Sequence, residues 1–326
     1  MEENNIKTKV VGVDISIEST TYAMVDVRGN ILAEDSFSTE DYPDVNNFVT
    51  ALSEKIVTLV EQNGGYETIR SIGVSCPSAS SVSGCIENAA NLPWKGVVPL
   101  AAMLRDRIGL AVGLSNDAHI SALGEYTFGS AHGMKNFIIC CLGVGIGSCF
   151  FSEGHEHQGH GGYAGEFGHT CVYPDGRQCG CGNRGCVEAY VGAKGIVHTA
   201  EELMAESDTP SLMRQLEKLS PRTIKECCDQ GDEMAIEVYR RTGRILGQAL
   251  ANYASLIDPE AIIFTGGVSH AGHWLFDSVE EEFEQVVFGN LKKKVRLLVS
   301  KLNDRERDVL GASALAWSVP EYSLFK

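Results

Sequence analysis

One histidine and three cysteines carry the most specific chemical signal in this sequence. His169, Cys179, Cys181 and Cys186 follow the spacing His-x9-Cys-x-Cys-x4-Cys, and the cysteines stand in the glycine-rich run CGCGNRGC. Thiolates and imidazoles are ligands that zinc prefers, and four protein ligands complete a tetrahedral site. The spacing therefore predicts one structural zinc site that holds a loop. The alternative is a set of unrelated reduced cysteines.

A carboxylate and two glycine-bearing turns form a second group of candidates. Asp117 follows Asn116 at the start of a helical pattern that runs to Gly129, and either side chain can cap that helix. Gly143, Gly145 and Gly147 lie between two strand patterns, and Gly266-Gly267 ends the strand pattern AIIFT. Backbone amides without side chains can approach a ligand closely at such turns. An ordinary glycine turn is the alternative.

The pattern of apolar residues predicts the elements that position these groups. Residues 10–37 alternate in the manner of a β-meander, and residues 44–62 have helical spacing. A second meander begins at Asn136, so we expect an internal repeat of strand, turn and strand. The remaining predictions are buried strands over 69–74 and 110–114, a long loop over 75–96, and a long helix over 232–257.

Length, charge and cysteine content restrict the class of protein. With 326 residues, 44% of them hydrophobic, the chain can bury two cores of ordinary domain size. A formal net charge of -16 argues against direct binding to nucleic acid. Neither a signal peptide nor a membrane span is recognised in the sequence. The eleven cysteines are an odd number, which favours a reducing compartment, and we expect a cytoplasmic protein.

The run GEFGH at 165–169, followed by CGCGNRGCVEAY, resembles the signature of the ROK family of sugar kinases, open reading frames and repressors. The resemblance extends to residues 76–96, 115–125 and 262–269, and so covers nearly the whole chain. It implies an α/β, actin-like (ribonuclease H-like) ATPase fold, with two domains around a central cleft for sugar and ATP. It also implies a homodimer or homotetramer.

The resemblance also implies domain boundaries. We expect an N-terminal α/β domain over residues 1–117, completed by a C-terminal helix within 309–326. A larger C-terminal α/β domain over residues 118–308 would then carry the zinc site.

Roles for individual residues follow from the same resemblance. Asp117 matches the catalytic aspartate, which would accept the proton of the sugar hydroxyl as it attacks the γ-phosphate of ATP. Glu166, His169 and Glu188 match residues that bind sugar hydroxyls, and His169 can serve zinc with one ring nitrogen and sugar with the other. Weaker candidates for sugar contact are Asn91, for which a turn residue is the alternative, and Asn116. ATP and magnesium would be held by Asp14, Gly143, Gly145, Gly147, Gly266 and Gly267.

Three segments depart from the kinase pattern. The first meander has Asp14-Ile15-Ser16-Ile17-Glu18-Ser19 where kinases of the family carry two glycines and a threonine, and a carboxylate there repels a triphosphate. Val144 replaces the usual threonine of the second loop, and Cys76-Pro77-Ser78-Ala79 replaces a more glycine-rich sugar loop. The sugar half of the site therefore matches better than the phosphate half.

Two functions compete on these grounds. The first is an ATP- and magnesium-dependent kinase that phosphorylates a hexose or N-acetylhexosamine, with Asp117 as general base. The second is a non-catalytic, sugar-binding regulator that resembles the family's repressors without a DNA-binding segment. A kinase using another phosphoryl donor, such as polyphosphate, rests on no specific residue.

Overall fold

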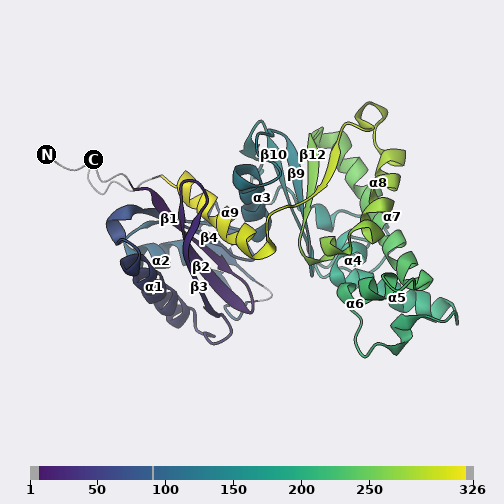
Figure 1. Cartoon of the computed structure of the whole chain (residues 1–326), viewed down its shortest axis with the longest axis horizontal. Coiled ribbons are helices and arrows are strands. Elements are labelled where there is room, and N and C mark those ends of the chain that lie inside the picture. The colour runs from purple at the N-terminus through teal and green to yellow at the C-terminus, as the bar shows by residue number, and fades with distance from the viewer. Residues whose placement is uncertain (1–6, 90–91, 321–326) are drawn as a thin grey trace. The chain divides into compact units, whose positions relative to one another are not determined.

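The computed structural model describes residues 7–89 and 92–320 (Figure 1), and these form two compact units. Unit 1 comprises residues 1–133, 159–162 and 301–326, and unit 2 comprises residues 134–158 and 163–300. Helix α3 (Asp117–Phe128) therefore belongs to unit 1, where it packs against the last helix, α9 (Asp304–Ser318). The sequence-based division, with 118–308 in the second domain, differs from this one in residues 118–133, 159–162 and 301–308.

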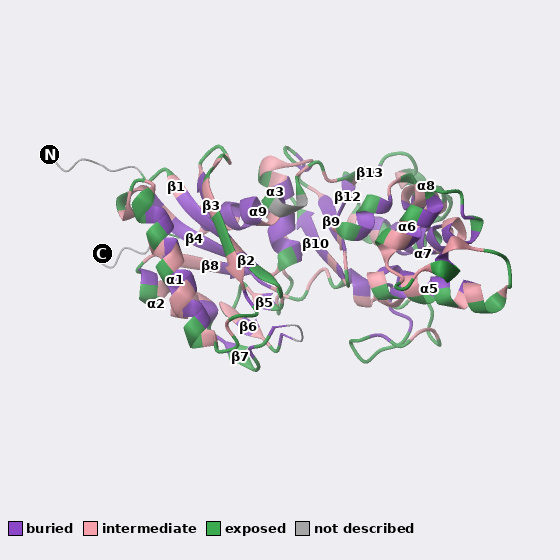
Figure 2. Cartoon of the chain, turned by 60° about the horizontal axis from the view of Figure 1, so that its bottom comes forward, coloured by how far each residue is buried: buried purple, intermediate pink, exposed green. Residues whose placement is uncertain are grey.

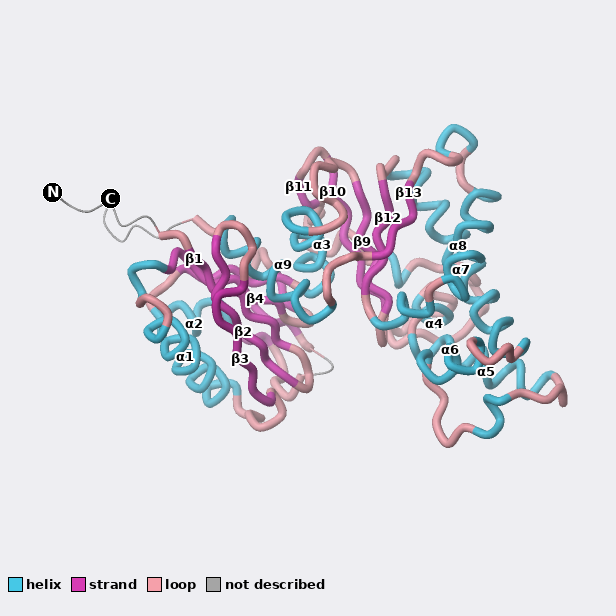
Figure 3. The backbone as a smooth tube through the Cα atoms, in the orientation of Figure 1, coloured by secondary structure: helices cyan, strands magenta, loops and turns pink. Residues whose placement is uncertain are grey.

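Unit 1 is built on a five-stranded sheet with the order β3-β2-β1-β4-β8 (Figure 3). The first three strands pair in antiparallel fashion, and β4 and β8 continue the sheet in parallel. This arrangement confirms the predicted meander and the two predicted buried strands. The strands are β1 (Lys9–Ile15), β2 (Ser19–Asp26), β3 (Ile31–Ser38), β4 (Ile69–Ser75) and β8 (Ala111–Ser115).

Helices cover both faces of this sheet, and alternate side chains of β1 point to one face or the other. Val11 and Val13 lie in the core formed with α1 (Val45–Gln62) and α2 (Leu100–Ile108), whereas Val10 contacts the cluster around α9. Successive residues of a strand point to opposite faces, so one strand serves two cores. Gly12 lets α9 lie directly on the sheet, because a side chain there would collide with the Val309 carbonyl oxygen.

The segment predicted as a long loop over 75–96 contains structure. It forms most of a small three-stranded antiparallel sheet from β5 (Ala79–Ser80), β6 (Cys85–Glu87) and β7 (Val97–Val98). The loop prediction was wrong for these residues, since strands of two or three residues are too short to show a period-2 pattern. Ile86, Leu92 and Trp94 are buried in the core of unit 1 and anchor the segment.

Unit 2 repeats the sheet of unit 1, with the order β11-β10-β9-β12-β13. Again an antiparallel trio is extended by two parallel strands, which confirms the predicted internal repeat. The strands are β9 (Phe137–Leu142), β10 (Ile146–Ser152), β11 (His155–Glu156), β12 (Ala261–Thr265) and β13 (Arg296–Val299).

The helices of unit 2 surround a large apolar core (Figure 2). The predicted long helix is α7 (Glu233–Ile257), capped by Asp232, whose side chain accepts hydrogen bonds from the Met234 and Ala235 amides. The other α-helices are α4 (Glu188–Val191), α5 (Ala193–Glu206), α6 (Pro221–Cys228) and α8 (His273–Val286). Short 3-10 helices in the chain are Tyr66–Thr68, Phe167–His169, Leu212–Gln215, Gly267–Ala271 and Gly289–Leu291.

Across residues 7–89 and 92–320, none of the helices combines the length and apolarity required to cross a membrane. The described residues include all eleven cysteines, and none of them forms a disulfide.

Candidate functional site

Asp14 and Asp117 lie at the ends of two elements of unit 1. Asp14 is the penultimate residue of β1, and Asp117 is the first residue of α3. Asn116 is the N-cap of α3, and its side-chain oxygen accepts a hydrogen bond from the His119 amide at 2.9 Å. Oδ1 of Asp117 accepts the Ala118 amide at 2.9 Å. The helix start thus holds the Asp117 carboxylate in a fixed orientation.

Desolvation weakens both carboxyl groups as acids, although the Asp117 residue keeps a solvent-exposed surface. Desolvation raises the pKa of Asp117, and, together with the negative charge of Asp308, it raises the pKa of Asp14 from 3.8 to about 7. A carboxyl group with a raised pKa accepts a proton more readily near neutral pH than an exposed one does. The pair therefore has the electrostatics of an acid–base site.

Sequence reasoning missed Asp308, which the first turn of α9 brings to this cluster. Its Oδ1 accepts hydrogen bonds from Ser121 Oγ and from Arg307 Nε, each at 3.2 Å. Burial raises its pKa, while the Arg307 guanidinium opposes that rise. No local signal marks a charged pair in a helix some 190 residues beyond Asp117, since only tertiary packing joins them.

The turn after Asp14 is closed by its own hydrogen bonds. The Ser16 amide donates to the Ser19 carbonyl at 2.9 Å, and the Ser19 amide donates to Ser16 Oγ at 3.1 Å. Both amides are therefore used within the protein. The side chain of Ile17 is 41% exposed at the tip of the turn.

In the predicted sugar loop, Cys76-Pro77-Ser78-Ala79, one non-glycine residue has a backbone conformation that is typical of glycine. Ser78 has φ +58°, a left-handed conformation that glycine adopts more readily. Its carbonyl oxygen accepts the Glu87 amide at 2.9 Å, which fixes the loop against β6. Asn91, another predicted sugar contact, lies outside the described residues.

The structure brings the four predicted zinc ligands together in unit 2. Their ligand atoms all lie within 4.8 Å of one another. Sγ of Cys179 is 3.7 Å from Nδ1 of His169, and Sγ of Cys181 is 3.7 Å from Sγ of Cys186. Bond lengths of about 2.3 Å to sulfur and 2.0 Å to nitrogen place tetrahedral ligands roughly 3.5–3.8 Å apart. The donor set and its spacing therefore fit a closed zinc site.

The predicted sugar residues adjoin this cysteine-histidine cluster. Because Nδ1 of His169 faces Cys179, its Nε2 is left on the other side, 4.0 Å from Oε2 of Glu166. Oε1 of Glu188 lies 3.8 Å from the Cys179 sulfur. Glu166, His169 and Glu188 thus lie in one region of unit 2, as two carboxylates flanking an imidazole.

The second glycine loop connects β9 to β10 beside this region. The Gly143 amide donates to the Gly145 carbonyl, and the Ile146 amide donates to Oε2 of Glu188 at 2.9 Å. Gly147 belongs to β10 and pairs with Cys141 of β9. Val144 at the tip is 73% exposed.

The two glycines after β12 have different surroundings. Gly266 has φ +85°, and an added Cβ would lie 2.5 Å from the Leu142 carbonyl oxygen, so this position is set by packing against β9. At Gly267 an added Cβ would meet nothing within 4 Å. Gly267 lines a pocket of about 450 Å³ together with Pro221, Arg222, Lys225, Glu226, Tyr239, His270 and Ala271.

The cationic side chains of this pocket were missed from the sequence. Arg222 and Lys225 come from α6, which begins with a capping box between Ser220 and Thr223. The box marks a helix start, but nothing local indicates that this helix lies beside Gly267.

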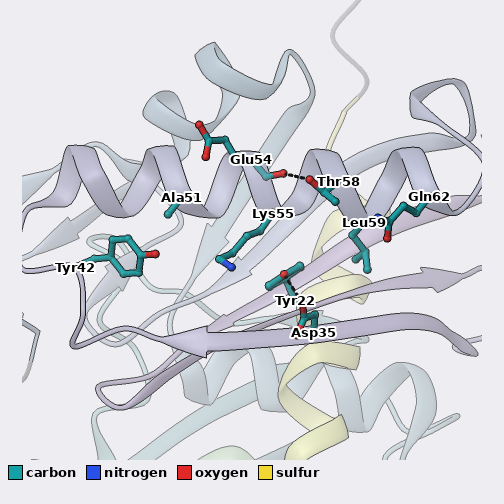
Figure 4. Close-up of a pocket in the computed structure, with 9 residues that line it drawn as sticks. All are labelled: Tyr22, Asp35, Tyr42, Ala51, Glu54, Lys55, Thr58, Leu59 and Gln62. Carbon is teal, nitrogen blue, oxygen red and sulfur yellow. Dashed lines mark hydrogen bonds between the residues drawn. The ribbon is translucent and has the colours of Figure 1, made fainter.

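A separate pocket of about 450 Å³ lies on unit 1 between α1 and strands β2 and β3 (Figure 4). Tyr22 donates a hydrogen bond to Asp35 at 3.1 Å, and Lys55 extends from α1 toward the sheet. None of the predicted site residues lines this pocket.

The chain is similar to known proteins over almost its whole length. The family model described as "ROK family" matches residues 10–319. A glucokinase of Streptomyces coelicolor is 31% identical over 94% of this chain and 96% of its own length. The crystal structure of a ROK family glucokinase from Streptomyces griseus, in complex with glucose and AMPPNP, has 30% identity and a TM-score of 0.75 over 95% of this chain and 99% of that one.

Repressors are also among the relatives. A xylose repressor of Caldicellulosiruptor bescii is 25% identical over 99% of this chain and 82% of its own length. The predicted α/β, actin-like fold is confirmed by the glucokinase structure. On the span of the family match and the identity to the glucokinases, the chain belongs to the ROK family.

Proposed function

We propose that this protein is an ATP-dependent kinase that transfers phosphate to a hydroxyl group of a hexose or N-acetylhexosamine. The observation that carries the proposal is the carboxylate of Asp117 at the start of α3, which the Ala118 amide holds in place and whose pKa is raised by desolvation. A protein that only binds sugar has no need for such a base. The similarity to glucokinases supports the same activity.

In this proposal Asp117 is the general base. Its Oδ1 accepts the Ala118 amide. Its Oδ2 would take the proton of the attacking sugar hydroxyl. The oxygen of the sugar then bonds to the γ-phosphorus as the bond to the β-phosphate oxygen breaks, with ADP as leaving group.

Asp14 would help to hold magnesium. Carboxylate oxygens are ligands that this ion prefers. Asp14 lies close to the carboxyl groups of Asp308 and Asp117, and a bound cation would reduce the repulsion between their negative charges. When bound, magnesium neutralises charge on the phosphates.

The residues of unit 2 would bind the two substrates. We assign sugar hydroxyls to Glu166, Nε2 of His169 and Glu188, since carboxylates and imidazole accept and donate the hydrogen bonds that hydroxyls require. The loop Gly143–Gly147 would contact phosphate through its backbone, and the pocket beside Gly267 would take the nucleoside. Arg222 and Lys225 would contribute positive charge there. Asn91 and Asn116 remain weaker proposals for sugar contact.

Zinc would be held by His169, Cys179, Cys181 and Cys186. With four protein ligands it supplies no open position, so its contribution is to fix the loop and the ring of His169.

One observation favours a second function, that of a non-catalytic sugar-binding regulator. The turn Ser16–Ser19 uses two of its amides internally and carries the Glu18 carboxylate, both of which oppose binding of a triphosphate. The similarity to a xylose repressor supports this alternative.

A coupled assay for ADP with Mg·ATP and a panel of hexoses and N-acetylhexosamines tests the proposal. We expect sugar-dependent turnover that falls by about 10²–10⁴-fold in Asp117→Ala. Asp106→Asn, an exposed aspartate of α2, is the matched control and should retain activity. A protein that is thermally stabilised by a sugar but turns over none of the panel would reject the kinase and support the regulator.

The predicted homodimer or homotetramer and cytoplasmic location remain predictions. Light scattering after gel filtration measures the oligomer directly.

A further inference from the structure

The side chain of Glu188 links the cysteine-histidine cluster to the glycine loop 143–147. Its Oε2 accepts the backbone N–H of Ile146 at 2.9 Å. Its other oxygen, Oε1, lies 3.8 Å from the sulfur of Cys179. The contact with Cys179 needs the thiol proton, which zinc would displace. In the metal-bound protein Glu188 is therefore linked to the cluster through the backbone that follows Cys186, while its carboxylate holds the loop backbone.

The same carboxylate lies against the glycine at the centre of the loop. A Cβ atom added at Gly145 would lie 2.5 Å from Oε2 of Glu188, well inside van der Waals contact. At Gly143, in the same loop, an added Cβ would meet only the Gly145 carbonyl oxygen at 3.9 Å. Neither glycine has positive φ, so backbone conformation does not require glycine at either position. A side chain at Gly145 would instead displace the Glu188 carboxylate from its present position.

The backbone before and after the cysteine-histidine cluster packs closely against the glycine loop and strand β10. Added Cβ atoms at Gly168 and Gly165 would lie 2.7 Å from the Ile146 carbonyl oxygen and 2.8 Å from that of Ser148. After Glu188, a Cβ at Gly192 would lie 2.9 Å from the Val144 carbonyl oxygen, and the Ala193 amide donates to the Gly143 carbonyl at 3.0 Å. Backbone that also carries His169 and follows Cys186 thus packs against the base of the loop and the start of β10, while the tip at Val144 stays exposed.

We propose that Glu188 is a positioning residue that ties the glycine loop 143–147 to the cysteine-histidine cluster, so that the loop takes its shape from the cluster. The tie itself is a property of unit 2 alone. Its consequence for phosphate binding rests on the proposed kinase function.

The tie also connects the two substrates. An ionised carboxylate has about four lone-pair sites, so Glu188 can accept a sugar hydroxyl while it keeps the Ile146 amide. A sugar bound to Glu188 would then hold the carboxylate, and through it the loop, in place for the nucleotide. Sugar would raise the affinity for nucleotide, and by linkage nucleotide would raise the affinity for sugar by the same factor.

Hydrogen exchange at the Ile146 amide, measured by NMR on the whole zinc-loaded protein without sugar or nucleotide, tests the tie directly. We expect exchange to quicken by about tenfold or more in Glu188→Ala, since the amide loses a charged acceptor. Gly145→Ala should quicken it similarly, because the new Cβ displaces the carboxylate. Glu188→Gln keeps an acceptor oxygen and should restore protection, and Gly143→Ala is the matched control that should leave protection unchanged.

Zinc content is measured in each variant, so that loss of the metal is not mistaken for loss of the tie. Wild-type exchange rates at Ile146 in a Glu188→Ala protein that retains its zinc would overturn the proposal. Equal quickening in Gly143→Ala and Gly145→Ala would also overturn it, since the effect would then be one of loop crowding alone.

A second measurement tests the connection between substrates. The affinity for AMPPNP is measured by calorimetry with and without a saturating hexose, and we expect the sugar-induced gain to shrink at least severalfold in Glu188→Ala. A gain that persists in full would overturn the coupling role. If the wild type binds no AMPPNP, the proposed kinase function fails, whereas exchange at Ile146 still decides whether the tie exists.

Discussion

The turn between β1 and β2 and the turn between β9 and β10 occupy the same place in two sheets of the same strand order. The first is closed locally by hydrogen bonds between Ser16 and Ser19. The second contains Gly143, Gly145 and Gly147. It has one local hydrogen bond, from the Gly143 amide to the Gly145 carbonyl, and a second from the Ile146 amide to Glu188, which is more than forty residues away. One topological position can thus be stabilised by its own residues alone or with the help of a distant side chain.

The two turns also differ in chemistry. Each turn uses two of its amides within the protein, those of Ser16 and Ser19 in the first and those of Gly143 and Ile146 in the second. The second differs in its glycines, which let a ligand approach the backbone closely. Unit 1 has carboxylates instead, since Asp14, Asp117 and Asp308 gather near its turn. Unit 2 has the glycine loop and the metal-type cluster. The following predictions probe this contrast.

The largest effect should follow from loss of the proposed zinc, which would support only the second turn. Cys186→Ser replaces a buried ligand, and we expect loss of the metal and destabilisation of unit 2 by more than about 4 kcal/mol. Zinc per chain by atomic absorption and thermal denaturation measure both effects. Cys171→Ser, an exposed thiol of the same segment outside the cluster, should change neither. Full zinc occupancy in Cys186→Ser would contradict the ligand assignment.

The next effect concerns the carboxylates beside the first turn. The pKa of Asp14 is raised from 3.8 to about 7, so the folded state favours the protonated form. Its contribution to stability is complete below about pH 4 and is lost as pH rises through about 7. Asn cannot ionise, so Asp14→Asn should be more stable than wild type at pH 8 by about 2–4 kcal/mol, and the difference should vanish near pH 4.

Urea unfolding at several pH values measures this difference. Asp41→Asn, an exposed aspartate after β3, is the control and should leave the pH dependence unchanged. If the unfolding free energies of wild type and Asp14→Asn changed in parallel between pH 4 and 8, Asp14 would have an ordinary pKa.

A smaller loss of stability should distinguish Gly266 from Gly267, which follow β12. Gly266→Ala combines a positive φ with a collision against the Leu142 carbonyl, and should cost about 1–3 kcal/mol of unfolding free energy. Gly267→Ala meets open space and should cost little. Calorimetric unfolding compares the two, and equal destabilisation would mean that the contact with β9 is unimportant.

The smallest expected effect tests whether the first turn faces nucleotide. Glu18→Thr removes a carboxylate, and we expect the affinity for Mg·ATP to rise by about 1 kcal/mol, or roughly fivefold. Calorimetry measures it, with Glu40→Gln as an exposed control after β3. Unchanged affinity would show that nucleotide lies beyond the reach of Glu18.

Sequence reasoning succeeded where a feature is local. The meander over 10–37 and the helix over 44–62 follow from apolar periodicity, and the structure has β1 to β3 and α1 there. The helix start at Asn116 follows from capping chemistry. The four metal-type ligands follow from dense spacing, since residues within a short glycine-rich run can gather around one point. Each depends on residues a few positions apart.

The remaining features depend on long-range packing. The period-2 pattern was too short to reveal β5 to β7, which are stabilised by burial of Ile86, Leu92 and Trp94 rather than by strand propensity. Asp308 joins Asp117 only because α9 returns to unit 1, and Arg222 adjoins Gly267 only because α6 packs there. No rule based on neighbouring residues in the sequence distinguishes Asp308 or Arg222 from other charged residues.

The sequence by itself determined which side chains have the chemistry, namely the aspartate at a helix start, the cysteines and histidine at ligand spacing, and the glycines at turns. Only the tertiary structure decided their partners. Gly145 reads as a phosphate-loop glycine in sequence, but in the fold its missing side chain also makes room for Glu188. The physical reason is one of range. Backbone hydrogen bonding and ligand spacing depend on residues a few positions apart, whereas steric exclusion and burial of charge depend on segments that only the fold places in contact.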